Sequence, residues 1–272
     1  ETDFKTGNKK NLVQSEDKTK KTNKETKKSD NSKTSKKELQ PTVLFNGKNL
    51  RGWEIKIKGS KLGENVNNTF KVHNGNLKVS YENYNSFKDR FGHIFYTKEE
   101  FKNYRLKLSY RFTGNHLEGA PGWSIKNSGI MLHCQHPKTM LIDQEFPVSA
   151  ETQLLGGLGD GERPTANICT PATDVDINNK LAEFHCINSN SKTFDDDDWV
   201  QVEVIVYSDS IVHHLIHGDT VLTYTNIRVG GDEVPDNYLN KIDQKLSKGY
   251  ISLQSEGHPV EFKDIMIKKL KD

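Results

Sequence analysis

Two stretches near the middle of the chain decide the fold. They read Asn-Ser-Gly-Ile-Met-Leu-His-Cys-Gln at residues 127–135 and Ser-Ala-Glu-Thr-Gln-Leu-Leu at residues 149–155. In both, polar residues recur with the period of two that is typical of a β-strand. We therefore expect two strands, each with one apolar face and one face of amide, carboxyl or imidazole groups. Such a face suits a cleft that binds hydroxyl groups and moves a proton.

The alternation also predicts which side chains share a face. Glu151 and Gln153 lie on one face of their strand. His133 and Gln135 lie on one face of theirs, opposite Cys134 and the neighbouring apolar residues. We expect the Glu, Gln and His groups to converge on one concave pocket.

The rest of the chain after residue 43 is also rich in strand patterns. Asn74-Gly75 predicts a tight hairpin, and only residues 98–101 indicate a short helical turn. Many short strands without helical periodicity predict an all-β fold of two packed antiparallel sheets. The expected strands cover residues 70–72, 77–79, 104–112, 199–207, 211–216, 221–224, 250–255 and 260–267.

The first forty residues differ in composition from the remainder. They contain 12 Lys and 7 acidic residues, with few sizeable apolar side chains. Such a segment buries too little surface to offset the entropy of ordering, so residues 1–40 are predicted to be a disordered Lys-rich tail or linker. Without them the chain carries 27 basic and 30 acidic residues. This balance gives no reason to expect a nucleic-acid partner, and residues 41–272 are long enough for one large β domain.

The sequence also bears on location. No apolar run approaches the roughly 20 residues that span a membrane, and the chain begins at Glu1. A polar tail before a compact domain leads us to expect an exported bacterial protein, a periplasmic or cell-surface lipoprotein whose signal and lipid anchor have been removed. Membrane contact is expected only through that anchor, and the oligomeric state is left open.

The three cysteines match no zinc-binding pattern. We expect Cys134 to be buried and free, and Cys169 and Cys186 to form a disulfide in an exported protein. The long stretch of residues 156–190 is rich in Gly, Pro, Asn and Asp, and we expect it to be an ordered wall of the cleft.

Several of these segments together resemble one known family. The Asn-Ser-Gly-Ile motif and the Glu-x-Gln strand are joined by segments at residues 44–53, 70–77 and 249–265. In this order they are similar to the 3-keto-disaccharide hydrolases, over about residues 43–270. The resemblance implies a jelly-roll sandwich of the concanavalin-like lectin and glucanase type. It also implies cleavage of glycosides that are oxidised at C3, through elimination and hydration started by one base.

Glu151 and His133 are the candidate catalytic residues, since a buried Glu and a His can both exchange protons near neutral pH. Glu151 could instead form a structural ion pair with Arg163 or a Lys. His133 stands where the family usually has Arg, and Glu256 stands where it usually has His. The family's Glu-x-Gln strand usually ends in Asp, where this chain has Gly156.

Further side chains are candidates for binding the sugar through amide, charged or aromatic groups. They are Gln153, Gln135, Asn127, Trp123, Arg163, His214, Gln254, Glu256 and His258. The sequence shows no cofactor motif and leaves a divalent metal open. Two rival interpretations remain: a non-catalytic carbohydrate-binding module that uses the same cleft, and an interaction protein that uses its Lys-rich tail.

Overall fold

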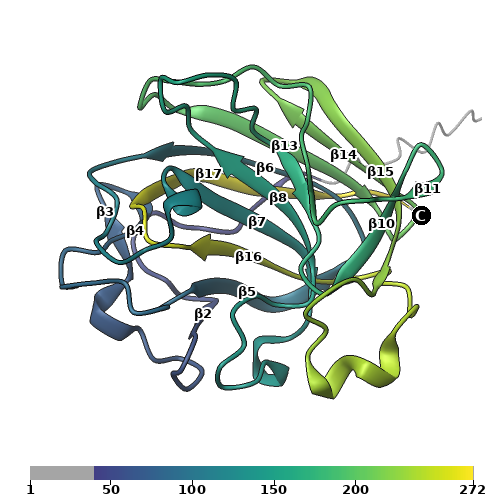
Figure 1. Cartoon of the computed structure of the whole chain (residues 1–272), viewed down its shortest axis with the longest axis horizontal. Coiled ribbons are helices and arrows are strands. Elements are labelled where there is room, and N and C mark those ends of the chain that lie inside the picture. Colours follow the sequence, from purple (N-terminus) through teal and green to yellow (C-terminus); the bar gives the residue numbers. More distant parts are fainter. Residues whose placement is uncertain (1–39, 272) are drawn as a thin grey trace, which may run out of the picture. The chain divides into compact units, whose positions relative to one another are not determined.

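The computed structural model describes residues 40–271, and the predicted tail falls outside this range apart from residue 40. Alternating strands dominate the described part, and they form two antiparallel sheets packed face to face (Figure 1). The larger sheet has the order β11 (Lys180–Leu181), β10 (Thr173–Ile177), β15 (Asp219–Val229), β14 (Ile211–Ile216), β13 (Val200–Tyr207), β6 (Asn103–Phe112), β17 (Val260–Lys269), β4 (Asn76–Val79) and β3 (Phe70–His73), and β1 (Thr42–Val43) pairs with β17.

The smaller sheet carries the two stretches with which the sequence analysis began. Its order is β12 (Cys186–Ile187), β9 (Asn167–Cys169), β8 (Ala150–Leu155), β7 (Asn127–Cys134), β16 (Gly249–Ser255), β5 (Gly92–Phe101) and β2 (Trp53–Ile57). Strands distant in sequence are thus neighbours in space, which is typical of a jelly roll. The predicted all-β sandwich of two antiparallel sheets is confirmed.

Helical structure in the described residues is limited to short 3-10 segments, namely η1 (Val66–Asn68), η2 (Gly122–Ser124), η3 (Pro137–Thr139) and η4 (Asp236–Lys241). None of the helices is long and apolar enough to cross a membrane. The helical turn expected at residues 98–101 is wrong, because β5 continues to Phe101. Ion pairs of Glu99 with Lys269 and of Glu100 with Lys248 hold this charged segment in the strand conformation.

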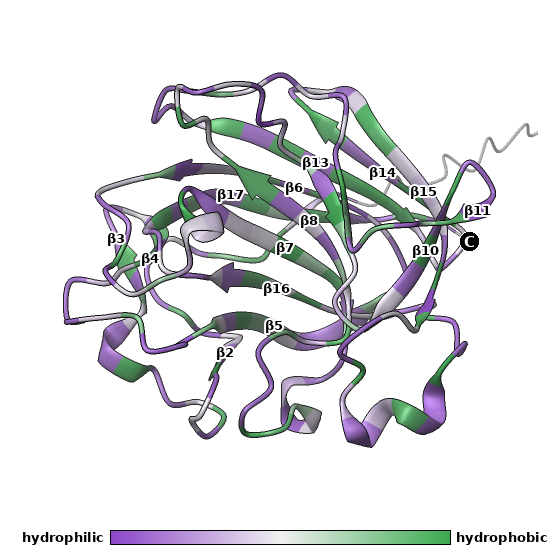
Figure 2. Cartoon of the chain, viewed as in Figure 1, coloured by the Kyte–Doolittle hydropathy of each residue, from purple (hydrophilic) through white to green (hydrophobic). Residues whose placement is uncertain are grey.

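The core lies between the two sheets and explains which face of each strand is apolar. Strands such as β8, β13 and β16 carry both hydrophilic and hydrophobic segments (Figure 2). Ile130, Leu154 and Leu253 of the smaller sheet pack in the core with Leu108 and Val204 of the larger one. In the smaller sheet, the residues next to Ile130, Leu154 and Leu253 along each strand therefore point to the outer face of that sheet.

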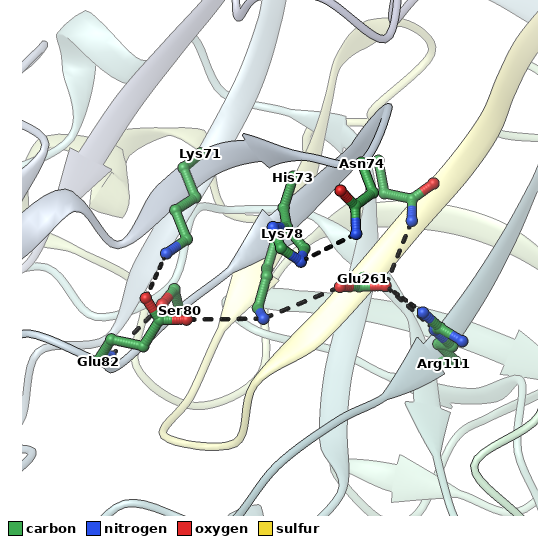
Figure 3. A network of polar contacts seen from close by, with 9 residues as sticks. Lys71, His73, Asn74, Lys78, Ser80, Glu82, Arg111 and Glu261 are labelled. Atoms are coloured by element: carbon green, nitrogen blue, oxygen red, sulfur yellow. Dashed lines mark hydrogen bonds and ion pairs between the residues drawn. The ribbon is translucent and has the colours of Figure 1, made fainter.

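A polar network on the larger sheet shows how this fold satisfies a buried structural carboxylate (Figure 3). Glu261 is 3% exposed and accepts hydrogen bonds from Arg111 at 2.8 and 3.1 Å and from Asn76 at 3.3 Å. Lys78 adds an ion pair at 3.9 Å. Charged neighbours on β4 and β6 thus offset the burial of this side chain.

Candidate functional site

A row of polar side chains crosses the outer face of the smaller sheet. From β2 to β9 it consists of Lys56, His93, Gln254, Gly129, Gln153 and Asn167, each placed by the pairing of neighbouring strands. The strand period of two brings these residues to one face. Glu151, two residues before Gln153, joins them on that face.

Gly129 leaves a gap at the centre of this row. A Cβ there would lie 2.4 Å from Glu151 Oε1 and 2.9 Å from Gln254 Oε1. Two polar side chains from the flanking strands β8 and β16 therefore meet above the glycine. The Gly of the Asn-Ser-Gly-Ile motif serves close approach of side chains, and its φ is outside the left-handed region.

A pocket of about 400 Å³ opens above this part of the sheet. This size lies within the range of small-molecule sites. Its lining includes Trp123, Asn127, Phe146, Glu151, Gln153, Arg163, Cys169, His185, Cys186 and Glu256. The segment of residues 156–190 supplies one side of the pocket, as expected, and the Cys169–Cys186 disulfide fastens that side between β9 and β12.

Two carboxyl groups lie close enough in this pocket for one to affect the pKa of the other. Burial raises the pKa of Glu151 to about 8. Burial, together with the nearby Glu151 carboxyl, raises the pKa of Glu256 well above its usual range. A structural ion pair would have lowered the pKa of Glu151. Arg163 instead donates to the carbonyl oxygens of Gly156 at 2.6 Å and Lys126 at 3.2 Å.

The sequence shows no second carboxyl beside Glu151 on the same strand. The structure supplies one from elsewhere, namely Glu256. It follows the last residue of β16, and the next residue, Gly257, donates its backbone N–H to Tyr81 Oη at 2.7 Å. Gly257 has a φ of 104° and leaves no room for a side chain, because a Cβ would lie 2.4 Å from that of Ala120. This tight turn fixes Glu256 over the pocket.

Unpartnered polar atoms concentrate in this part of the described chain. Among residues 40–271, Asn127 Oδ1, Glu256 Oε2, both amide atoms of Gln254 and both ring nitrogens of His93 are buried without a hydrogen-bond partner. Each such atom typically costs about 1–3 kcal/mol of stability. Their contrast with the fully paired Glu261 indicates groups positioned for a ligand.

Several predicted binding residues lie where a ligand would meet them. Asn127 donates to Trp123 O at 3.4 Å, which orients its free Oδ1. Gln153 Oε1 accepts from Asn167 at 3.0 Å, so its Nε2 group is the part that a ligand can use. Trp123 is 55% exposed at the rim and stacks on Phe91, with centroids 6.0 Å apart and planes 4° apart.

The placement expected for His133 is wrong. Cys134 pairs with Tyr250 and Met131 with Ser252, so β7 holds one more residue than β16 over this interval. This β-bulge, in which His133 has a φ of 52°, reverses the alternation. His133 therefore points to the inner side, donates to Ser208 O at 3.1 Å and packs on Tyr104.

The same bulge brings Cys134 to the outer face. It packs there with Phe95, Met131 and Met140 rather than with the apolar residues between the sheets. Its expected burial and free thiol are confirmed.

Four further candidates are absent from the lining of the pocket, namely Gln135, His214, His258 and Gln254, of which Gln254 lies beside it above Gly129. Gln135 is engaged with Thr139, Gln144 and Val148, and so holds the segment of residues 136–148. His214 lies between the sheets, where its Nε2 shares a hydrogen bond with Thr152 Oγ1 and its Nδ1 donates to the carbonyl oxygen of Ala166, each at 2.9 Å.

His258 is placed beyond the lining residues. It stacks on His116 with centroids 6.1 Å apart, and burial lowers its pKa to about 4. Because it adjoins the charged groups of Lys126 and Arg163, it lies at the margin of the pocket.

The sequence analysis missed His93 and Phe146. His93 and Phe95 share one face of β5 while Ile94 points to the core, a pattern that could have indicated a polar position on the outer face. Phe146 lies in a segment without strand periodicity, and only the folded chain brings it to the pocket.

One group of potential metal ligands occurs in the described residues. Atoms of Cys169, His185 and Cys186 lie within 4.8 Å of one another. Both sulfur atoms are used by the disulfide, so this group offers no thiolates in the oxidised protein.

The fold and the pocket define a two-sheet jelly-roll domain with a small-molecule-sized pocket on its smaller sheet. The chain belongs to the 3-keto-alpha-glucoside-1,2-lyase-like domain family, whose model matches residues 40–268. A search of curated proteins finds no match.

Three solved structures are similar to this chain over most of its length. A proposed glycosyl hydrolase from Parabacteroides distasonis is 20% identical, with a TM-score of 0.48 over 85% of this chain and 94% of that one. A carbohydrate-binding module from Bacillus subtilis is 8% identical, with a TM-score of 0.47 over 80% and 96%. A protein of unknown function with a galectin-like fold, also from Bacillus subtilis, is 11% identical, with a TM-score of 0.45 over 85% and 95%. At these identities none of them transfers an activity to this chain.

Proposed function

We propose that this protein is an exported enzyme that cleaves glycosides oxidised at C3. The observation that carries the proposal is the pair of buried carboxyl groups, Glu151 and Glu256, in a pocket of about 400 Å³ within a domain of this family. A disulfide joins Cys169 and Cys186, which supports an oxidising compartment outside the cytoplasm.

The chemistry needs one base and one acid. A ketone at C3 acidifies the hydrogen on C2, and a carboxylate removes that proton. The electron pair forms the C1–C2 double bond, the C1–O bond breaks, and the leaving oxygen takes a proton from a carboxylic acid. Addition of water to the double bond then gives the net hydrolysis.

The two carboxyls suit this division of work. Like charges close together disfavour double ionisation, so Glu256 keeps its proton when Glu151 loses its own at a pH of about 8. Glu151 has the lower of the two raised pKa values and is assigned as the base. Glu256 keeps its proton to a higher pH and is assigned as the acid. The free Nε2 group of Gln153 lies on the same wall, where it can donate to the enolate oxygen, and the free Oδ1 of Asn127 can accept from a sugar hydroxyl.

The test uses p-nitrophenyl 3-keto-α-glucoside, with and without divalent metal, and its unoxidised parent as the comparison. Glu151→Gln keeps the shape and hydrogen bonding of the side chain, so we expect it to bind the sugar. We also expect it to lose turnover by about a hundredfold or more, the usual weight of a positioned proton-transfer group. Glu118→Gln, at an exposed position outside the pocket, is the matched control.

Wild-type turnover in Glu151→Gln would remove Glu151 as the base. Binding without cleavage of either sugar by the wild type would favour the second candidate function, a carbohydrate-binding module. The exposed Trp123 at the rim, stacked on Phe91, is the observation that supports this alternative, since aromatic platforms are typical of sugar-binding surfaces.

A further inference from the structure

Beside the pocket, in edge-to-face contact with Phe146 of its lining, lies a buried histidine without a protein partner. His93 is fully buried, and neither ring nitrogen has a hydrogen-bond partner. Gln254 is also fully buried, pairs with His93 across β16 and β5, and has both amide atoms unpartnered. Four polar atoms on two adjacent side chains are thus withheld from water and from the rest of the described protein.

We propose that His93 and Gln254 form an inner subsite that binds one hydroxyl group of the sugar, behind the ring of Phe146. This inference rests on the proposed function and assigns part of its substrate recognition. A neutral imidazole and a primary amide each offer a donor and an acceptor, and a hydroxyl group can use both. A sugar hydroxyl therefore satisfies side chains that the free protein leaves unpaired.

The charge state of His93 supports a neutral ligand. Burial, and to a lesser degree the charge of Lys56, lowers the pKa of His93 to about 3, so the ring is uncharged at neutral pH. Lys56 is next to His93 in the row, but its Nζ donates to the carbonyl oxygens of Ile57 at 3.1 Å and Ile142 at 2.8 Å. Among the described residues, no other ionised group shifts the pKa of His93.

The position of Phe146 explains why the subsite is closed in the free protein. Its ring meets that of His93 edge to face, with centroids 5.9 Å apart, and it lines the pocket that contains Glu151. A second pocket of about 680 Å³ is lined by residues 141–146, and thus also by Phe146. The ring therefore borders the free space of two pockets, into which it can turn.

The subsite also adjoins the reacting groups. The Oε1 atoms of Gln254 and Glu151 converge above Gly129, where a single Cβ would touch both. A hydroxyl held by Gln254 would therefore belong to the same sugar ring whose C2 hydrogen faces Glu151. The subsite orients that ring, and His93 and Gln254 act as binding residues rather than as the base.

The test compares wild type with His93→Leu, which is similar in volume and removes both nitrogens. Affinity is measured by calorimetry for methyl α-glucopyranoside and its 2-, 3-, 4- and 6-deoxy analogues. We expect one deoxy analogue to bind wild type about tenfold more weakly than the parent, the usual effect of a lost hydrogen bond. His93→Leu should bind the parent about tenfold more weakly and should no longer distinguish that analogue.

Thermal unfolding of the free proteins gives a second readout that does not depend on the sugar. Removing a buried, unpartnered imidazole should raise the Tm of His93→Leu by about 2–4 °C. A structural role for His93 predicts the reverse, a lower Tm with unchanged affinity. Phe146→Ala, which uncovers the subsite, should keep the preference among the deoxy analogues.

Other outcomes overturn the inference separately from the proposed function. If wild type and His93→Leu share one affinity profile while wild type still cleaves the 3-keto sugar, only the inner subsite fails. If wild type neither binds these sugars nor cleaves the oxidised one, both fail. Binding of Mn²⁺ alone, abolished in His93→Leu, would make His93 a metal ligand and would also overturn the hydroxyl site.

Discussion

In this protein, the partners of a buried polar side chain distinguish a structural residue from a candidate functional one. Glu261 and Glu151 are both buried carboxyls on strands, at 3% and 6% exposure. Glu261 lies among Arg111, Lys78 and Asn76, whereas burial raises the pKa of Glu151 to about 8. The sequence shows two glutamates in strand patterns and cannot distinguish them, because their partners come from other strands.

The raised pKa of Glu151 makes stability depend on pH. Between about 4.3, the usual value, and about 8, the folded protein holds a proton that the unfolded chain has lost. This contribution to stability is complete below the unfolded pKa and is lost as the pH rises through the folded one. His93, His133, His214 and His258 act in the opposite sense, but only below about 6.5, because burial lowers their pKa values.

We therefore expect the free energy of unfolding of the wild type to fall between pH 6.5 and 8.5, by up to ~1.4 kcal/mol per pH unit for each proton released. Glu151→Gln removes one such proton and should show a smaller slope. Urea denaturation of both proteins across this range measures the two slopes, and equal slopes would contradict a raised pKa at Glu151.

At the scale of elements, strand periodicity predicted most of the fold and part of the site. The alternation in β8 placed Glu151 and Gln153 on one face, and the structure agrees. It failed in β7 because register also depends on the partner strand: one extra residue against β16 reversed the faces of His133 and Cys134. Gln135 was assigned by the same alternation and instead fastens a loop.

The glycine of β7 gives a prediction at this scale. Gly129→Ala should not strain the backbone, but its Cβ would take the space that Glu151 Oε1 and Gln254 Oε1 occupy. We expect turnover of the 3-keto sugar to fall about a hundredfold, as expected for a displaced catalytic group. Gly122→Ala, where a Cβ meets nothing within 4 Å, is the matched control. Steady-state kinetics measure the effect, and normal turnover in Gly129→Ala would show that the gap is not needed.

In the whole domain, one covalent link joins the two strands at the edge of the smaller sheet. Cys169 and Cys186 are joined, as expected, across a separation of 17 residues. Their sequence positions indicated the bond, whereas its place beside Glu151 followed only from the pairing of β8 with β9. The pocket is therefore built from segments that are far apart in the chain, which is why composition and spacing could not predict its shape.

Replacing both cysteines by serine should lower the free energy of unfolding by an amount on the order of 3 kcal/mol, the entropy of closing such a loop. Denaturation of the variant and the wild type without reductant measures the difference. Thiol titration of the unfolded, unreduced wild type should find one reactive group, from Cys134. Three reactive thiols, or an unchanged stability, would contradict this expectation.

The bulge in β7 makes strand length itself a determinant of the pocket. Odd-numbered and even-numbered residues of β7 exchange faces of the sheet at the extra residue. Deleting His133 would restore the regular pairing of β7 with β16 and leave Leu132 alone between Met131 and Cys134, which both face outward. The number of residues in a strand, and not only their identity, thus decides which side chains reach its binding face.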